Sequence, residues 1–328
     1  MSSQPVLQHD DRMPRLVEVP AGGMDGQARG GISPGSSRWS CEELEKGNIL
    51  YWPAVPFDFP EEEQEFLLHW HATSSRFHKN IAYRPSEDKI TGLPQSKTEE
   101  AQRLHKILRG YSRRVYDFLS GLVPAYREGW RRDFASFRPY EEQGRDIRLR
   151  ARNDLLHTDA FPTRPIHGDR ILRFFTNINP SEPRVWVTGE TFEALAERYA
   201  RSAGLPKNDD DGTAGWFSRA WKRAAAALKI PGADRSPYDD FMHRFHNFLK
   251  ENEQFQKECP KQRWEFPPGS CWMVFTDMVS HSVLSGRFAL EQTFIISRDT
   301  LALPQHAPVA VLERLCGHRL AAGLPGAR

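Results

Sequence analysis

The second half of the sequence contains six short β-type segments, and these constrain the fold more than any other feature. They are rich in β-branched, aromatic and aliphatic residues, and Pro, Gly and Asn separate them, as expected of strands joined by turns. The segments are 147–150, 171–178, 184–188, 269–275, 280–284 and 288–297. Many short strands of this kind are typical of a β-sandwich or a jelly roll.

Helical patterns precede these segments and interrupt them. Between Thr98 and Leu122, apolar residues recur at helical spacing, which predicts a long amphipathic helix packed against a sheet. The residues that form this pattern are Leu104, Ile107, Leu108, Tyr111, Val115, Phe118, Leu119 and Leu122. A shorter helix is predicted after Pro60, and a terminal helix over 310–320. The fold class is therefore α+β, with a jelly-roll core braced by N-terminal helices.

The chain is predicted to form one domain with an insertion. Residues 1–45 have low hydrophobicity and many turn-forming residues, so we expect a disordered tail there. Residues 46–305 form the predicted domain, and its helical insertion spans about 190–258. Residues 306–328 are expected to form the C-terminal helix and a tail.

Composition excludes several classes of protein. With 45 basic and 43 acidic residues, the chain has no overall charge that would drive it onto nucleic acid. Its four cysteines are scattered, which favours a reducing compartment. No secretory signal or run of about 18 apolar residues is present. We therefore expect a cytoplasmic protein that does not cross a membrane.

Residues 216–229 mix tryptophans with cations, as helices at a membrane surface do. Such a helix could rest on the cytoplasmic face of the inner membrane. The alternative is an ordinary amphipathic helix that packs its tryptophans on the core.

The sequence His157-Thr158-Asp159 suggests a metal site. Two residues apart on an extended strand, His157 and Asp159 point to the same side of the chain. His281, between two apolar strands, is the natural third ligand. Two imidazoles and one carboxylate leave adjacent coordination positions open, which is the facial triad of non-haem Fe(II) oxygenases.

Two blocks of sequence resemble the Kdo hydroxylases, which act on 3-deoxy-D-manno-oct-2-ulosonic acid (Kdo). The first block runs from Leu156 through the His157-Thr158-Asp159 motif to Pro180. The second runs from Pro267 through His281 to Phe294. The resemblance covers roughly residues 46–305 and does not extend to the tail or to residues 205–235.

This resemblance implies a double-stranded β-helix core, which agrees with the predicted jelly roll. It also implies iron ligands at His157, Asp159 and His281, with 2-oxoglutarate and O2 as co-substrates. The implied reaction adds a hydroxyl group to C3 of Kdo, giving the Ko sugar, in the Kdo-containing lipid A glycolipid of lipopolysaccharide. Two alternatives stay open: an oxygenase of another substrate, and a non-catalytic jelly-roll module that binds an anionic ligand.

The far carboxylate of 2-oxoglutarate requires a buried cation, preferably an arginine. Relatives at large place this arginine about ten residues after the distal histidine, but position 291 is Glu. Arg173, in the middle of an apolar strand, is our first choice. The other candidates for this subsite are Arg138, Arg184, Trp186 and Gln292. For the anionic substrate we expect Arg164, Arg170 and Arg287 near the mouth of the cleft.

Other motifs are set aside. His69 and His71 lie in a helical stretch, where residues two apart do not share a face. His243 and His246 could share a helical face but lack a carboxylate-rich partner, so all four are interpreted as packing or surface residues. Neither a GxSxG elbow nor a phosphate-binding GxxxxGK[ST] loop is present.

Overall fold

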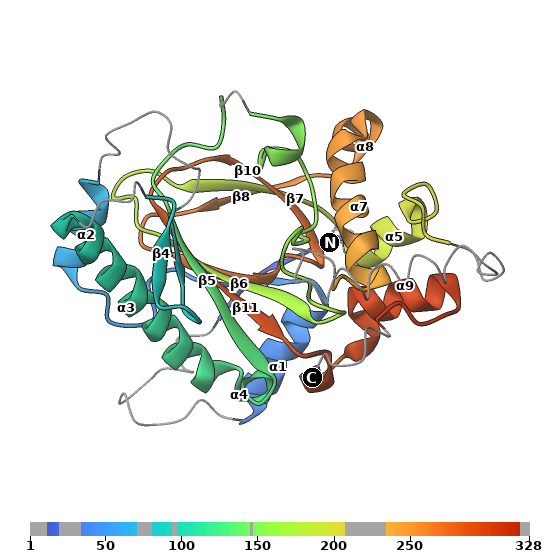
Figure 1. Cartoon of the computed structure of the whole chain (residues 1–328), viewed down its shortest axis with the longest axis horizontal. Helices are drawn as coiled ribbons and strands as arrows, with labels where there is room; N and C mark the ends of the chain where they lie inside the picture. The colour runs from blue at the N-terminus through green and yellow to red at the C-terminus, as the bar shows by residue number, and fades with distance from the viewer. Residues whose placement is uncertain are drawn as a thin grey trace, which may run out of the picture.

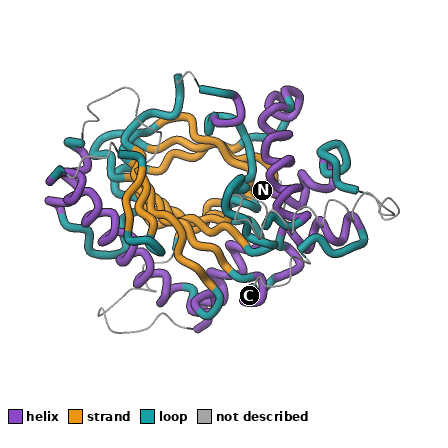
Figure 2. The backbone as a smooth tube through the Cα atoms, in the orientation of Figure 1, coloured by secondary structure: helices purple, strands orange, loops and turns teal. Residues whose placement is uncertain are grey.

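The computed structural model describes most of the chain, and two facing β-sheets form its centre (Figures 1 and 2). The described residues are 12–19, 34–70, 81–93, 98–144, 147–206 and 234–321. Residues 216–229, for which a membrane-surface helix was considered, lie outside these ranges. Among the described residues, no helix is long and apolar enough to cross a membrane.

The larger sheet has eight strands and the smaller has three. In order across the larger sheet these are β1 (Leu16–Glu18), β2 (Ile49–Trp52), β9 (Cys271–Phe275), β6 (Arg170–Asn177), β11 (Ala289–Ile296), β5 (Trp130–Arg138), β3 (Ile81–Arg84) and β4 (Lys89–Thr91). The smaller sheet is β10 (Val279–Ser285), β7 (Arg184–Thr191) and β8 (Gln262–Phe266). All strand pairs are antiparallel except β1 with β2.

Aromatic residues from both sheets fill part of the space between them. Phe175 of β6 and Trp272 of β9 come from the larger sheet, and Trp186 of β7 and Phe266 of β8 from the smaller one. The rings of Phe266 and Trp272 stack at 3.9 Å between centroids, and Trp186 meets Trp272 edge to face at 5.6 Å. Such packing of two sheets gives the predicted α+β fold with a jelly-roll core.

Helices cover the larger sheet and one end of the sandwich. The four N-terminal helices are α1 (Pro34–Glu45), α2 (Glu61–Leu68), α3 (Glu99–Leu122) and α4 (Pro124–Arg127). The later helices within the described residues are α5 (Phe192–Tyr199), α7 (Pro237–Glu251), α8 (Glu253–Glu258) and α9 (Pro308–Cys316), which gather at one end of the sandwich (Figure 1). Three short 3₁₀ helices are η2 (Leu149–Ala151), η3 (Arg298–Thr300) and η4 (Pro304–His306).

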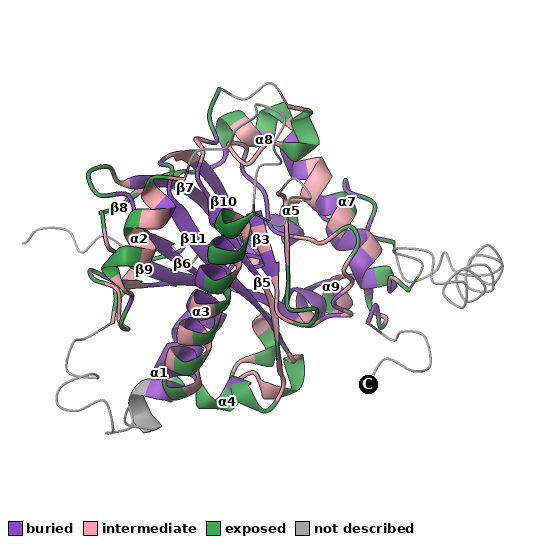
Figure 3. Cartoon of the chain, turned by 60° about the vertical axis from the view of Figure 1, so that its left-hand side comes forward, coloured by how far each residue is buried: buried purple, intermediate pink, exposed green. Residues whose placement is uncertain are grey.

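The long amphipathic helix predicted from the sequence is α3. The Thr98 side chain accepts a hydrogen bond from the backbone N–H of Ala101 and so caps its first turn. Its apolar face, which includes Leu104, Leu108 and Tyr111, is buried in the main core, while its other face is exposed (Figure 3). The prediction of a scaffold helix behind the sheet is confirmed.

Some details differ from the sequence predictions. The strand β1 pairs with β2, and helix α1 buries Cys41 and Leu44, although both elements fall within the predicted disordered tail. Residues 147–150 were predicted as a strand, but Leu149 begins the 3₁₀ helix η2 and its side chain stays 45% exposed. The alternation of apolar and charged residues there resembles an edge strand, but Leu149 has no sheet face to pack on.

All four cysteines are free thiols with buried side chains. Cys41 lies in α1, Cys271 in β9 and Cys316 in α9, and Cys259 directly follows α8.

Candidate active site

Backbone pairing brings the three predicted metal ligands together. His157 and His281 exchange two backbone hydrogen bonds, of 3.1 and 2.9 Å, in an isolated antiparallel bridge beside β10. The backbone N–H of Asp159 donates to the carbonyl of Thr276 at 2.8 Å. The segment 157–159 is therefore held along the edge of β10, although about 120 residues of chain separate it from His281.

The three side chains form one compact, buried cluster. Their nitrogen and oxygen donor atoms all lie within 4.8 Å of one another. The Nε2 atom of His157 is 3.7 Å from Oδ1 of Asp159, and the Nε2 atom of His281 is 4.0 Å from Oδ2. Each residue is less than a tenth exposed. The sequence prediction that these residues meet is confirmed.

Hydrogen bonds to the backbone fix how the two imidazoles face the cluster. Nδ1 of His157 donates to the carbonyl of Leu155 at 2.7 Å, and Nδ1 of His281 donates to that of Val279 at 2.9 Å. Both Nε2 atoms then carry the lone pair, as metal-binding histidines require. Oδ2 of Asp159 is also buried and, among the described residues, accepts no well-aligned hydrogen bond, although the Arg173 guanidinium forms an ion pair with it at 3.1 Å. The donor set therefore fits a divalent metal such as Fe(II).

Burial and nearby charges set the protonation of the cluster. Burial lowers the pKa of His157 and of His281, and the positive charge of Lys250 lowers that of His157 further. Burial alone would raise the pKa of Asp159, but the charge of Arg173 holds it well below its usual range. Neutral imidazoles and an ionised carboxylate are the forms that bind metal.

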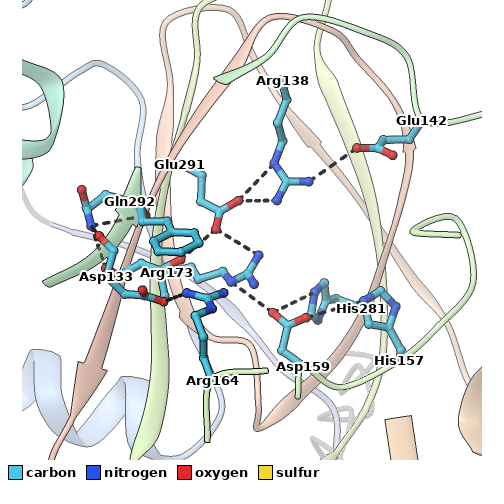
Figure 4. A network of polar contacts seen from close by, with 12 residues as sticks. Asp133, Arg138, Glu142, His157, Asp159, Arg164, Arg173, His281, Glu291 and Gln292 are labelled. Carbon is cyan, nitrogen blue, oxygen red and sulfur yellow. Dashed lines mark hydrogen bonds and ion pairs between the residues drawn. The ribbon is translucent and has the colours of Figure 1, made fainter. Parts of the chain in front are cut away.

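A chain of buried ion pairs extends from Asp159 across the larger sheet (Figure 4). Arg173 lies between Asp159 Oδ2, at 3.1 Å, and Glu291 Oε1, at 3.0 Å. Arg138 binds the other oxygen of Glu291 and also contacts Glu142 at 3.4 Å. These two arginines hold the pKa of Glu291 below its usual range despite its burial. Both guanidinium charges are thus already engaged by carboxylates of the protein.

A cavity of about 300 Å³ lies beside the cluster. Side chains of the strands line one part of it, and side chains of α7 and of the segment 150–153 line another. The lining residues are Arg138, Arg150, Ala151, Asn153, His157, Asp159, Pro162, Arg173, Phe175, Arg184, Trp186, His246, Lys250, His281 and Val283.

Arg184 lines this cavity and, among the described residues, has two buried donor groups without a hydrogen-bond or ion-pair partner. Its side chain is fully buried, one Nη atom donates to the carbonyl of Gly286, and Nε and the other Nη have no partner among the described residues. Burial, followed by the nearby charge of Arg138, lowers the pKa of Arg184 to about 10. A buried guanidinium with free donors is suited to a carboxylate.

Trp186 connects Arg184 to the metal ligands. Its indole stacks on the His281 ring at 5.2 Å, and its buried Nε1 has no hydrogen-bond partner in the described part of the chain. Arg184 and Trp186 are two residues apart on β7 and so face the same side, about 7 Å apart along the strand. An elongated dicarboxylate could therefore reach from the cluster to Arg184.

Other predicted contacts lie elsewhere. Gln292 does not line the cavity: Glu291 takes the inward position on β11, and the Gln292 amide donates to backbone carbonyls, including that of Asp133 at 2.9 Å. Arg170 is not at a mouth but is fully buried, with its Nε 2.8 Å from Asp277. Arg164 pairs with Asp133, and Arg287 stands over the Phe288 ring. None of these four residues lines the cavity.

His246 was interpreted from the sequence as a packing or surface residue, but it lies beside the cluster. Its ring meets that of His157 at 4.9 Å, nearly edge to face, and its Nδ1 donates to the carbonyl of Thr158 at 2.8 Å. The only sequence signal is its spacing of four residues from Lys250, which places both on one face of α7. Nothing in the sequence indicates that this face meets the His157-Thr158-Asp159 segment.

The buried state of His246 predicts how stability depends on pH. Burial, and then the charge of Lys250, lowers its pKa to about 4. As the pH falls below about 6.5, the unfolded chain protonates this histidine before the folded chain does, so the fold loses stability. We expect His246 to lower the free energy of unfolding of the metal-free protein by up to about 1.4 kcal/mol for each pH unit between pH 6.5 and 4, as the pH falls. Urea unfolding at several pH values measures this effect.

The matched variant is His246→Gln, which does not titrate in this range. Its unfolding free energy should fall less steeply with decreasing pH than that of the unaltered protein. Equal slopes for the two proteins would contradict the assigned protonation.

Comparisons with known proteins agree with this geometry. Residues 30–319 match the family of 3-deoxy-D-manno-oct-2-ulosonic acid (Kdo) hydroxylases. A solved structure of the Kdo hydroxylase KdoO, a non-heme Fe(II) α-ketoglutarate-dependent dioxygenase with α-ketoglutarate and Fe(III) bound, has 31% sequence identity and a TM-score of 0.78. The match covers 94% of this chain and 97% of KdoO. For KdoO with cobalt(II), the identity is 31%, the TM-score 0.79 and the coverage 95% and 99%. A comparison with curated protein sequences gives no match.

Proposed function

Because this chain belongs to the Kdo hydroxylase family, we propose that its buried cavity is the site where Kdo is hydroxylated at C3. The chain is an Fe(II)- and 2-oxoglutarate-dependent dioxygenase with O2 as its second co-substrate. The assignment of the site rests on the buried cluster of His157, Asp159 and His281. Its donor atoms lie together beside a cavity in which Arg184 has two donor groups without a partner among the described residues.

His157, Asp159 and His281 would hold the ferrous ion. Their backbone hydrogen bonds keep both imidazoles in the required orientation without help from the metal, so little reorganisation accompanies metal binding. Arg173 balances the charge of Asp159 from one side. In this role Arg173 is a positioning residue rather than the co-substrate clamp predicted from the sequence.

Arg184 and Trp186 would hold the far carboxylate of 2-oxoglutarate. Both line the cavity, and both have buried donors for which the described ranges of the chain supply no partner. When bound, iron and 2-oxoglutarate supply the oxidising chemistry: O2 is divided between succinate, formed with loss of carbon dioxide, and the new hydroxyl group of the substrate. The protein holds the reacting carbon in place, and the apolar surfaces of Phe175 and Val283 help to exclude water.

We further propose that the Kdo is carried on a lipid A glycolipid at a membrane surface. The family supports Kdo itself as the substrate, and the resemblance in sequence suggests its lipid carrier. The cytoplasmic location of the chain, in peripheral contact with the inner membrane, stays a prediction.

The function is tested by supplying Fe(II), 2-oxoglutarate, O2 and Kdo-lipid A to the full chain. Mass spectrometry should show the gain of one oxygen atom on Kdo, with succinate formed in equal amount. Succinate without oxygen on Kdo would indicate a different substrate. If neither product forms with the iron-loaded protein, the chain is a non-catalytic binding module.

A further inference from the structure

The cavity has two walls that come from different parts of the chain. We call the side chains contributed by β5, β6, β7 and β10 the strand wall: Arg138, Arg173, Phe175, Arg184, Trp186, His281 and Val283. The helix wall consists of Arg150, Ala151, Asn153, His246 and Lys250. The two walls meet at His157, whose ring contacts both His281 and His246. The proposed function uses the strand wall for the co-substrate and leaves the helix wall without a role.

Lys250 is the buried cation of the helix wall. The residue is only 4% exposed, and its Nζ donates to the backbone carbonyl of Arg150 at 3.1 Å. It follows His246 by one turn of α7, so its ammonium group lies on the side of the helix that faces the metal ligands. Arg150 is far more exposed and pairs with Glu251.

Charge balance indicates what the helix wall can accept. On the strand wall, Arg138 and Arg173 face Glu142 and Glu291, so these four charges cancel. The remaining charges also cancel. The two positive charges of a ferrous ion and the one of Arg184 equal the negative charges of ionised Asp159 and dianionic 2-oxoglutarate. A second organic anion that enters the cavity therefore brings a charge that the described residues of the strand wall do not balance. Lys250 supplies the opposite charge on the other side of the cluster.

We propose that the helix wall is the substrate's anion subsite, in which Lys250 binds the carboxylate of the sugar acid. This proposal rests on the proposed function, since it concerns the orientation of Kdo in the same cavity. The carboxyl carbon C1 of Kdo is separated from C3 by one carbon atom. Anchoring the carboxylate at Lys250 thus fixes C3 close to the metal ligands, and positioning of this kind contributes strongly to rate.

The test measures binding, without turnover, to the anaerobic protein loaded with Fe(II) and 2-oxoglutarate. The two ligands are the methyl glycoside of Kdo and its methyl ester, which lacks the negative charge. By calorimetry, Lys250→Met should weaken binding of the glycoside acid at least about tenfold, as expected for loss of a charged hydrogen bond. The same substitution should change binding of the ester less than about twofold, and Lys250→Arg should recover most of the affinity for the acid.

The matched control is Lys257→Met, a lysine in the last turn of the neighbouring helix α8 that does not line the cavity. Its affinities for acid and ester should equal those of the unaltered protein. Equal weakening of acid and ester by Lys250→Met would overturn the subsite, because the residue would then support only the loop at Arg150. A loss confined to 2-oxoglutarate would overturn it too. If the unaltered protein neither binds the glycoside nor hydroxylates Kdo, the proposed function itself fails.

Discussion

His157→Ala and Asp159→Ala should each abolish iron binding and hydroxylation of Kdo, with losses of more than about 100-fold. Residues that only support metal ligands already contribute about 10- to 100-fold to metal affinity or activity, and direct ligands contribute more. His157 and Asp159 supply two of the three donors of the cluster. Metal content measured on the purified variants, and oxygen gain on Kdo measured by mass spectrometry, should fall together.

The fold should survive these substitutions. In Asp159→Ala, Arg173 retains its ion pair with Glu291, so no buried charge is left without a partner. In His157→Ala, the backbone bridge to His281 uses no side-chain atom. His69→Ala is the matched control, because His69 is exposed at the end of α2 and far along the chain from the cluster. Full activity of either ligand variant, with iron retained, would refute the ligand assignment.

Arg184→Met should weaken the binding of 2-oxoglutarate at least about 30-fold. Truncating one partner of a buried, hydrogen-bonded charge pair costs about 2–5 kcal/mol, which corresponds to at least that factor. Methionine keeps much of the volume but removes the charge and the donors. The dissociation constant of 2-oxoglutarate for the anaerobic Fe(II) protein measures the effect. The analogue 2-oxopentanoate, which lacks the far carboxylate, should bind the variant and the unaltered protein about equally.

Two further arginines make this test selective. Arg263→Met alters an exposed residue of β8 that pairs with Glu265, and it should leave the affinity for 2-oxoglutarate unchanged. Arg173→Met should instead weaken iron binding, because it removes the side chain that positions the Asp159 carboxylate. If Arg173→Met reduced the affinity for 2-oxoglutarate more than Arg184→Met and left iron content intact, the first choice from the sequence would be correct.

The sequence predicts much of the sandwich because the apolar runs of its central strands have a clear local signal. The segments that form β6, β7, β9, β10 and β11 were all recognised as strands. Strand β5 was missed, since its first half contains Arg131, Arg132 and Asp133, which break the apolar pattern. These charges are tolerated because side chains in the first half of this strand are only partly buried.

The choice among the arginines could not be made from the sequence. Arg173 and Arg184 both lie on buried strands, and the difference between them depends on partners distant in the chain. On β11, Glu291 pairs in register with Phe175 of β6, which brings its carboxylate next to Arg173. Arg184 meets instead the backbone of Gly286. Such pairings are set by sheet register and not by any local pattern.

The position of α7 beside the metal ligands could not be predicted from the local sequence pattern either. The spacing of His246 and Lys250 shows only that they share a helical face. Which surface that face covers depends on how the helix packs, and here it covers the segment 157–159, with the Thr158 carbonyl as the point of contact. The metal ligands His157 and Asp159 were predictable, because a histidine and an aspartate two residues apart on a strand point to the same side and can bind one metal ion.

The buried cysteine thiols affect how well the enzyme resists oxidation during catalysis. Iron and O2 that react without a substrate release oxidants, and cysteine is vulnerable to these mainly as the thiolate. Burial raises the pKa of Cys41 and of Cys271 to about 12, so both stay protonated at neutral pH and are shielded from small oxidants in solution. These two thiols are thereby kept in their inert form, and repeated idle cycles should damage the residues that line the cavity first.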